Sequence, residues 1–302
     1  MSGPPPPQGV PRVTAVVLNW CDADATTTCI ESLAGSRYPD LSLLVVDNGS
    51  PDRSGEVLQR RHPEVPFLQT GANLGYTGGN NRGIAHALQT GADYVFVVNN
   101  DTWVHPDAMG ILVDAARSRP RVGAVAPTIV RMDAPHRLWY GGGAFDVKRA
   151  LGIHWNGTIS TDGALPPAAS TPARPVTFFT GCAVLLDGAA LRAVGAFEES
   201  YFLYVEDAEL SVRLVRSGWE ILHAPEARVE HRVEAEGRDP EPYQIRFRDR
   251  NRRRLARTHF TAMERLAFAA WFYPTRLVHL IRYLALGDVR RAGAIVRGMG
   301  ER

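Results

Sequence analysis

The sequence predicts an α/β fold in which a mostly parallel sheet is flanked by helices and followed by a helical extension. From residue 13 onward, apolar runs of strand length alternate with stretches of helix length, and the runs are apolar on both faces. Hydrophobic residues make up 45% and charged residues 22% of the 302, which is typical of a globular protein. We therefore expect a disordered, Pro-rich lead-in at 1–12, an α/β domain at 13–260 and an amphipathic helical extension at 261–302.

Strands and helices follow each other in pairs through the first half of the chain. Apolar runs predict strands at 14–20, 41–47, 65–69, 93–99 and 122–127. Helices are predicted from an N-cap at Asp24 to Ser36, at 53–61, from a glycine-rich loop at 71–83 to Thr90, and at 106–118.

The second half has a different composition. Tyr140–Gly143 predicts a hairpin or loop, and residues 155–175, rich in small residues and proline, predict a long loop of the kind that is usually functional or disordered. A strand is expected at 177–187, a helix at 206–216 and a strand at 219–225. The chain beyond Pro240 is expected to be helical.

Cysteine content and the N-terminus bear on the cellular compartment. The cysteines Cys21, Cys29 and Cys182 are too few and too scattered for a disulfide framework or a zinc site. The first residues, MSGPPPPQGVPR, lack the apolar core of a signal peptide. We expect a cytoplasmic protein, with peripheral contact at the inner face of the cell membrane left open.

Polar residues collect where the predicted parallel strands end, which is where ligands bind in such sheets. They are Asn19, Asp47, the loop at 71–83 and the cluster Asn99-Asn100-Asp101. The loop precedes a helix that could cradle phosphate, but it lacks the GxGxxG spacing and a P-loop lysine, which disfavours a dinucleotide or ATP site. Asn99 and Asp101 offer oxygen ligands at alternate positions, which suits Mg²⁺ or Mn²⁺; the cluster could equally cap a helix.

A second acidic group, Glu206-Asp207-Ala208-Glu209, is predicted to lie at a helix N-terminus. The helix dipole favours ionised acids there, so capping is one interpretation. Asp207 could also be a general base. His231, in the turn-like stretch RVEHRVEAEG, is a candidate metal ligand, although a lone histidine is more often a surface or core residue.

Taken together, these segments resemble the inverting, nucleotide-sugar-dependent glycosyltransferases of family 2, which have the Rossmann-like GT-A fold, and in particular their rhamnosyltransferase-like subgroup. The resemblance spans roughly residues 13–260. It rests on VVLNW (16–20), VVDNGSPD (45–52), NLGYTGGNNRG (73–83), NNDTWVHPD (99–107), FFTGCAVLLD (178–187), YFLYVEDAELSVRLVRSGW (201–219) and RDRNRRRLARTHF (248–260).

The resemblance implies roles for these residues. The donor would be a nucleotide-diphosphate sugar, such as a dTDP-deoxysugar, and the acceptor a hydroxyl of a polysaccharide, lipid-linked glycan or natural product. Asp207, with Glu206 beside it, would be catalytic, and Asp101, Asn99 and His231 would hold the divalent cation, with Asn99 standing where many relatives carry Asp. The nucleotide sugar would contact Asn19, Asp47, Asn73, Gly75, Asn80, Asn100, Gly181 and Cys182.

The C-terminal third raises two further questions. Its arginines, which include Arg250 of an Arg-Asn pair that recurs in the relatives, could read phosphate in nucleic acid, but a solvated helix beside the donor's diphosphate is favoured and no nucleic acid is expected. The apolar stretch 266–286 is interrupted by Pro274 and Arg276, so it is expected to lie on a membrane or against a second subunit instead of spanning a bilayer.

Two alternatives to a glycosyltransferase remain open from the residues alone. A sugar nucleotidyltransferase would usually carry a basic, Gly-rich signature after the first strand, and NWCDADATT offers none. A non-catalytic nucleotide-sugar-binding protein would have no use for Asp207 as a base.

Overall fold

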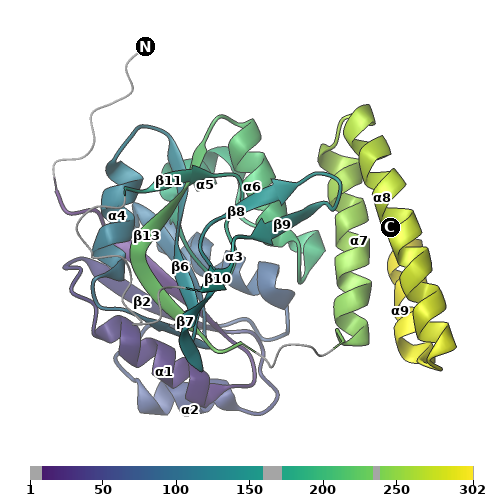
Figure 1. Cartoon of the computed structure of the whole chain (residues 1–302). Helices are drawn as coiled ribbons and strands as arrows, with labels where there is room; N and C mark the ends of the chain where they lie inside the picture. The colour runs from purple at the N-terminus through teal and green to yellow at the C-terminus, as the bar shows by residue number, and fades with distance from the viewer. Residues whose placement is uncertain (1–8, 159–171, 234–238, 302) are drawn as a thin grey trace.

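Four parallel strands form the centre of the fold (Figure 1). In spatial order they are β3 (Phe67–Gln69), β2 (Leu41–Asp47), β1 (Val13–Asn19) and β4 (Tyr94–Asn99). The computed structural model describes residues 9–158, 172–233 and 239–301. Asn19 pairs in register with Asp47, and Asp47 with Gln69, so the polar strand ends meet at one edge of the sheet.

Antiparallel strands extend this centre on the β4 side. β12 (Ala183–Asp187) runs antiparallel between β4 and β6 (Val122–Arg131), and β13 (Glu220–His231) lies parallel to β6. The smaller strands are β5 (Thr102–Val104), β7 (Ala134–Tyr140), β8 (Gly143–Asp146), β9 (Leu151–His154), β10 (Gly157–Thr158) and β11 (Arg174–Val176). The expected α/β fold with a mostly parallel central sheet is confirmed, but the antiparallel strands were not distinguished by the sequence pattern.

Helices cover both faces of the sheet. They are α1 (Ala23–Ala34), α2 (Ser54–Arg61), α3 (Gly75–Gln89), α4 (Ala108–Arg117), α5 (Gly188–Val194), a 3₁₀ turn η1 (Glu199–Tyr201) and α6 (Glu206–Arg216). Helices α1 and α2 pack together, whereas α3 lies over β2, β1 and β4. The chain reverses its direction of travel across the sheet between β3 and β4, and right-handed crossovers then place α3 on the opposite face.

Three helices, α7 (Pro242–His259), α8 (Ala262–Ala285) and α9 (Val289–Gly300), lie side by side at one end of the molecule (Figure 1). Phe260, Phe268 and Phe272 join the main hydrophobic core, and Ile295 on α9 packs with Ile245 on α7. None of the described helices is both long and apolar enough to cross a membrane. The helical C-terminal region is as expected.

Several element boundaries differ from the sequence predictions. The N-cap of α1 is Asp22 and not Asp24, because Oδ1 of Asp22 accepts the N–H of Ala25. The strand expected at 177–187 begins only at Ala183, and the strand expected to end at 225 continues to His231. The lead-in at 1–8 and the part of the expected long loop at 159–171 lie outside the described residues.

Most of the loop expected at 71–83 is the first part of α3. Its glycines allow the helix to lie directly on β1, since a Cβ on Gly83 would come within 2.3 Å of Cγ1 of Val16. Glycine normally disfavours helices, which is why the sequence pattern indicated a loop. Close packing against the sheet outweighs that preference here.

Candidate functional site

A hydrogen bond between the side chains of Asn19 and Asp47 joins the polar strand ends beneath the site. Asp47 is 1% exposed, and its carboxylate accepts hydrogen bonds from Asn19 (2.6 Å), Ser50 Oγ (2.6 Å) and Gln69 (2.7 Å). Asn19 is fully buried and accepts from Thr26 Oγ1 (2.8 Å). Protein donors occupy both side chains, so in this conformation they shape the floor of the site without lining it.

An open pocket of about 610 Å³ lies above this edge. Five of the residues singled out in the sequence line it: Asn73, Gly75, Asn99, Asn100 and Asp101. The remaining lining residues were not predicted and are mostly aromatic or apolar: Leu18, Trp20, Asn48, Tyr76, Phe202, Leu203, Tyr204, Tyr243 and Phe247. A pocket with aromatic walls and a few polar groups at one end is suited to a ligand that has a flat ring and a polar tail.

The segment Phe202–Val205 forms one wall of the pocket in a strained conformation. Phe202, Tyr204 and Val205 all have positive φ, at 63°, 69° and 73°. Such backbone costs about 1–3 kcal/mol per residue and persists only where its surroundings hold it. Here the buried amide of Asn251 on α7 lies 2.8–2.9 Å from the carbonyl oxygens of Tyr201, Leu203 and Tyr204.

The start of α3 forms a second wall. Asn48 donates from Nδ2 to Oδ1 of Asn73 (3.1 Å) and to the carbonyl of Gly75 (3.0 Å). Gly75 has φ +72°, and a Cβ there would lie 2.5 Å from the ring of Phe202, so only glycine fits. Asn80, expected to contact the nucleotide, is instead buried and donates to the carbonyl of Tyr76 one turn earlier (2.9 Å).

The Asn99-Asn100-Asp101 cluster is brought beside His231 by strand pairing. His231 lies at the end of β13, not in a turn as expected, and pairs with Thr102 of β5. Its Nε2 is 3.3 Å from Oδ1 of Asp101. Burial opposes the imidazolium form, but Cys182 and Asp101 raise the pKa of His231 to about 10. The imidazolium form of His231 is therefore favoured beside Asp101.

Asp101 and His231 fit a divalent cation only in part. Oδ1 of Asp101 is buried without an aligned hydrogen bond and faces Nε2 of His231 at 3.3 Å, so a bound cation would have to displace the proton that His231 carries there. Carboxylate and amide oxygens suit Mg²⁺ or Mn²⁺. However, no group of three or more His, Cys, Asp or Glu side chains among the described residues could hold a metal ion, so the remaining ligands would have to come from the substrate or water.

The acids of α6 connect to the end of β4 through Gly181 and Cys182. Oδ2 of Asp207 accepts the N–H of Gly181 (3.1 Å), and the carbonyl of Cys182 accepts the N–H of Asn99 (2.8 Å). Neither Gly181 nor Cys182 lines the pocket, but the hydroxyl of the pocket residue Tyr76 donates to the carbonyl of Gly181 (2.6 Å). Asp207 does not line the pocket itself, but this short segment connects it to Tyr76 in the pocket wall and to Asn99.

The two adjacent acids differ in their surroundings. Glu206 is 6% exposed, and burial together with the neighbouring Asp207 raises its pKa well above the ordinary value. Burial also raises the pKa of Asp207, but the N–H groups of Gly181 and Ala208 favour its charged form. The protonated form is thus favoured for Glu206, whereas two N–H donors favour the carboxylate form of Asp207.

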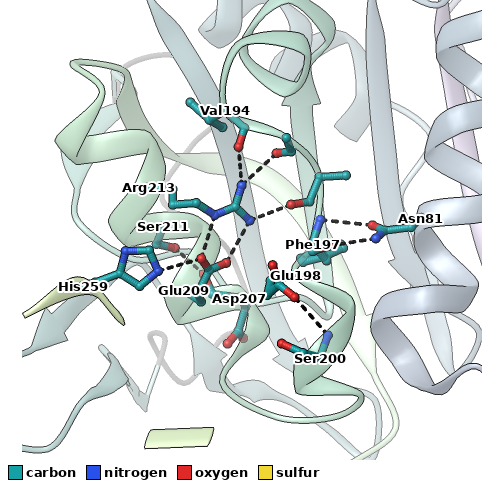
Figure 2. Close-up of polar contacts among 12 residues, drawn as sticks. Asn81, Val194, Phe197, Glu198, Ser200, Asp207, Glu209, Ser211, Arg213 and His259 are labelled. Atoms are coloured by element: carbon teal, nitrogen blue, oxygen red, sulfur yellow. Dashed lines mark hydrogen bonds and ion pairs between the residues drawn. The ribbon is translucent and has the colours of Figure 1, made fainter. Parts of the chain in front are cut away.

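A polar network on the same helix fixes α6 in place (Figure 2). Arg213 donates to both carboxylate oxygens of Glu209 (2.7 and 2.8 Å) and to the carbonyls of Val194 and Ala196. Nε2 of His259, at the end of α7, lies 2.9 Å from the same carboxylate. Burial would raise the pKa of Glu209, but His259 and Arg213 lower it overall. The third acid of the group is therefore structural.

Comparisons with known proteins agree with this architecture. Residues 14–178 match the sequence pattern of glycosyl transferase family 2. The chain is 34% identical over 228 residues to the N-acetylglucosaminyl-diphospho-decaprenol L-rhamnosyltransferase of Mycobacterium tuberculosis (strain ATCC 25618 / H37Rv), covering 70% of this chain and 73% of that protein. It is 29% identical to the galactofuranosyltransferase GlfT1 of Mycolicibacterium smegmatis, covering 68% of this chain and 66% of that protein.

Solved structures show the same fold at low sequence identity. The mannosyltransferase PcManGT from Pyrobaculum calidifontis, in complex with GDP-Man and Mn²⁺, has a TM-score of 0.58 and 16% identity, over 96% of this chain and 74% of that chain. The S. aureus TarS fragment 1-349 has a TM-score of 0.57 and 12% identity, over 96% and 81%. These likenesses support the GT-A fold. From its family pattern and its identity to the rhamnosyltransferase, the chain belongs to glycosyl transferase family 2 and is a glycosyltransferase.

Proposed function

We propose that this enzyme transfers a deoxysugar, L-rhamnose, from a dTDP donor to a hydroxyl of a lipid-linked glycan, with inversion at the anomeric carbon. The donor and acceptor classes are supported by the 34% identity to an L-rhamnosyltransferase whose name specifies N-acetylglucosaminyl-diphospho-decaprenol. The observation that carries the proposal is the link Asp207–Gly181–Cys182–Asn99, because it connects the carboxylate of Asp207 to Asn99 at the polar end of the pocket.

Asp207 is the general base of the proposed reaction. It removes the proton of the acceptor hydroxyl while the acceptor oxygen bonds to the anomeric carbon and the bond from that carbon to the diphosphate oxygen breaks. One displacement inverts the configuration, so no second nucleophilic carboxylate is needed. Glu206, protonated in the interior, does not compete for the proton.

The donor is proposed to lie in the aromatic-walled pocket. The aromatic side chains of Trp20, Tyr76 and Phe202 line the pocket and would contact the nucleobase or sugar. The diphosphate would point toward Asp101, which has His231 beside it. When bound there, a Mg²⁺ or Mn²⁺ ion would offset the negative charge of the departing diphosphate. Asn99 and Asp101 would hold such an ion with their side-chain oxygens, and the donor would supply further ligands.

Asp207→Asn tests the base directly. The amide can accept the N–H of Gly181 but cannot take a proton, so kcat should fall by a factor on the order of 10²–10⁴. Thermal shifts with dTDP-, UDP- and GDP-sugars, measured with Mn²⁺ and after chelation, should show retained dTDP-sugar binding. The exposed Asp114→Asn on α4 is the matched control and should leave turnover unchanged.

The pH profile gives an independent check of the same assignment. Because burial raises the pKa of Asp207, the basic form is lost as pH falls through that raised value. The acid limb of kcat/KM should therefore lie above the ordinary Asp value of about 3.9. Near-normal turnover of Asp207→Asn would exclude it as the base, and absence of a thermal shift with every nucleotide sugar would contradict the donor class.

A further inference from the structure

The outer face of α8 is apolar along its whole length. Of the sixteen large hydrophobic side chains that are exposed among the described residues, ten lie within 263–296. Seven are on α8, mostly three, four or seven residues apart, with exposed fractions of 46–74%: Met263, Leu266, Tyr273, Leu277, Val278, Ile281 and Leu284. At 1.5 Å per residue this stripe is about 30 Å long. Leu286, Val289 and Val296 extend it toward and along α9.

The stripe belongs to a firmly anchored helix. On its opposite face Phe268, Phe272 and Tyr283 are at most 4% exposed and lie in the core. Arg276 bonds to the buried Asp249 of α7 (3.1 Å), and Thr261 and Glu264 form a capping box at the helix start. In Figure 1, α8 and α9 form the outermost layer beyond α7. The apolar residues are therefore held in place on the surface by a packed inner face.

The C-terminal segment that contains α7, α8 and α9 has a net positive charge, whereas the rest of the protein has a net negative charge. Residues 242–302 contain 14 arginines and 4 acidic residues, whereas residues 1–241 contain 20 basic and 28 acidic residues. The small overall charge of +2 conceals this division. On α8 and α9, four arginines are exposed: Arg265, Arg282, Arg290 and Arg297. An apolar face combined with exposed arginines is the pattern of helices that lie in the plane of an anionic membrane surface.

We propose that the outer face of α8 and α9 docks on a bilayer that contains anionic phospholipids. A second copy of the chain is the weaker candidate, because joining two such faces would bring two strongly positive helical bundles together. The negative remainder of the protein would be repelled by the same lipids, so the charge division also orients the enzyme. The proposal concerns attachment and does not depend on the donor or acceptor proposed above.

Vesicle co-sedimentation of the full chain, without donor or acceptor, tests this surface. Vesicles of phosphatidylcholine with phosphatidylglycerol should bind the protein, vesicles of phosphatidylcholine alone should bind far less, and added salt should weaken binding. Leu277→Glu with Ile281→Glu should reduce binding about tenfold or more, since both side chains would enter the lipid interface. Arg290→Glu with Arg297→Glu should remove the preference for anionic lipid.

Val215→Glu is the matched control, because Val215 is an exposed valine on α6 and is not part of α8 or α9. It should bind vesicles as the parent does, and circular dichroism should confirm that all variants are folded. Equal binding of the parent to both vesicle types, or to neither, would overturn the proposal. So would sedimentation of the parent as a dimer that Leu277→Glu with Ile281→Glu converts to a monomer, because the face would then be occupied by a second copy.

Discussion

At the scale of single residues, Asn251 connects the C-terminal helices to the candidate site. Its side chain is fully buried, and it supplies the donor for three carbonyls of a segment in which three non-glycine residues have positive φ. Arg250 adds a bond to the carbonyl of Tyr201 (2.8 Å). The Arg-Asn pair was expected beside the diphosphate, but these contacts indicate a positioning role for the wall formed by Phe202 and Tyr204.

Asn251→Ala should weaken donor binding about tenfold, which corresponds to about 1.4 kcal/mol lost in ordering the pocket wall. Unfolding should also become easier by about 1–3 kcal/mol, because buried carbonyls lose their donor. Isothermal titration with the donor, well below the unfolding midpoint, separates the two effects. Arg257→Ala, an exposed change on the same helix, should alter neither. Unchanged donor affinity in a destabilised Asn251→Ala would reduce the residue to a purely structural role.

The residues of the site were predictable where the chemistry is local. Asp101 and Asp207 stand out in short polar clusters, whereas His231 was a weaker candidate because it stands alone in its stretch of sequence. The aromatic wall was missed because Trp20, Phe202 and Phe247 meet only in three dimensions. The spacing of Tyr243 and Phe247, one turn apart on a helix otherwise rich in arginine, was the available signal.

At the scale of elements, α6 is held by a network that is remote in sequence. Arg213 crosses to the carbonyls of Val194 and Ala196, and Glu209 joins Arg213 to His259 at the end of α7. The helix bounds at 206–216 were predicted correctly, since its acidic start and apolar face are encoded locally. The network was not predicted, because the sequence pattern does not show which backbone carbonyls the Arg213 side chain will contact.

Arg213→Ala should lower the free energy of unfolding by about 3–5 kcal/mol, because it leaves the carboxylate of Glu209, 3% exposed, without its main partner. Chemical denaturation measures this change. Arg60→Ala removes an exposed arginine that lies 3.7 Å from Glu56, and it should change stability by no more than about 0.5 kcal/mol. Similar losses for both variants would mean that the network of Figure 2 does not anchor α6.

At the scale of the whole molecule, the boundary expected at 260–261 divides a continuous core. Phe268 and Phe272 of α8 pack in the same core as Leu255 and Phe260, and Ile295 of α9 contacts Ile245 of α7. The length and apolar composition of the C-terminal stretch predicted helices, but not which of their faces would be buried. Tyr243 and Phe247 of α7 line the pocket, and α7 packs against the last 42 residues of the chain. These residues therefore stabilise one wall of the site.

A chain that ends at Phe260 should therefore bind the donor more weakly than the full chain and unfold at a lower temperature. Its α7 would lose the contacts that hold Tyr243 and Phe247 against the pocket, and it would expose large core side chains such as Leu255. Differential scanning calorimetry with and without the nucleotide sugar measures both effects.

Leu277→Glu with Ile281→Glu in the full chain is the control, because it alters the outer face of α8 and leaves its buried face intact. If residues 261–302 were an independent attachment, the shortened chain would keep the melting temperature and donor affinity of the full chain. The contacts of α7 with α8 and α9 predict the opposite, because α7 both lines the pocket and packs against these two helices.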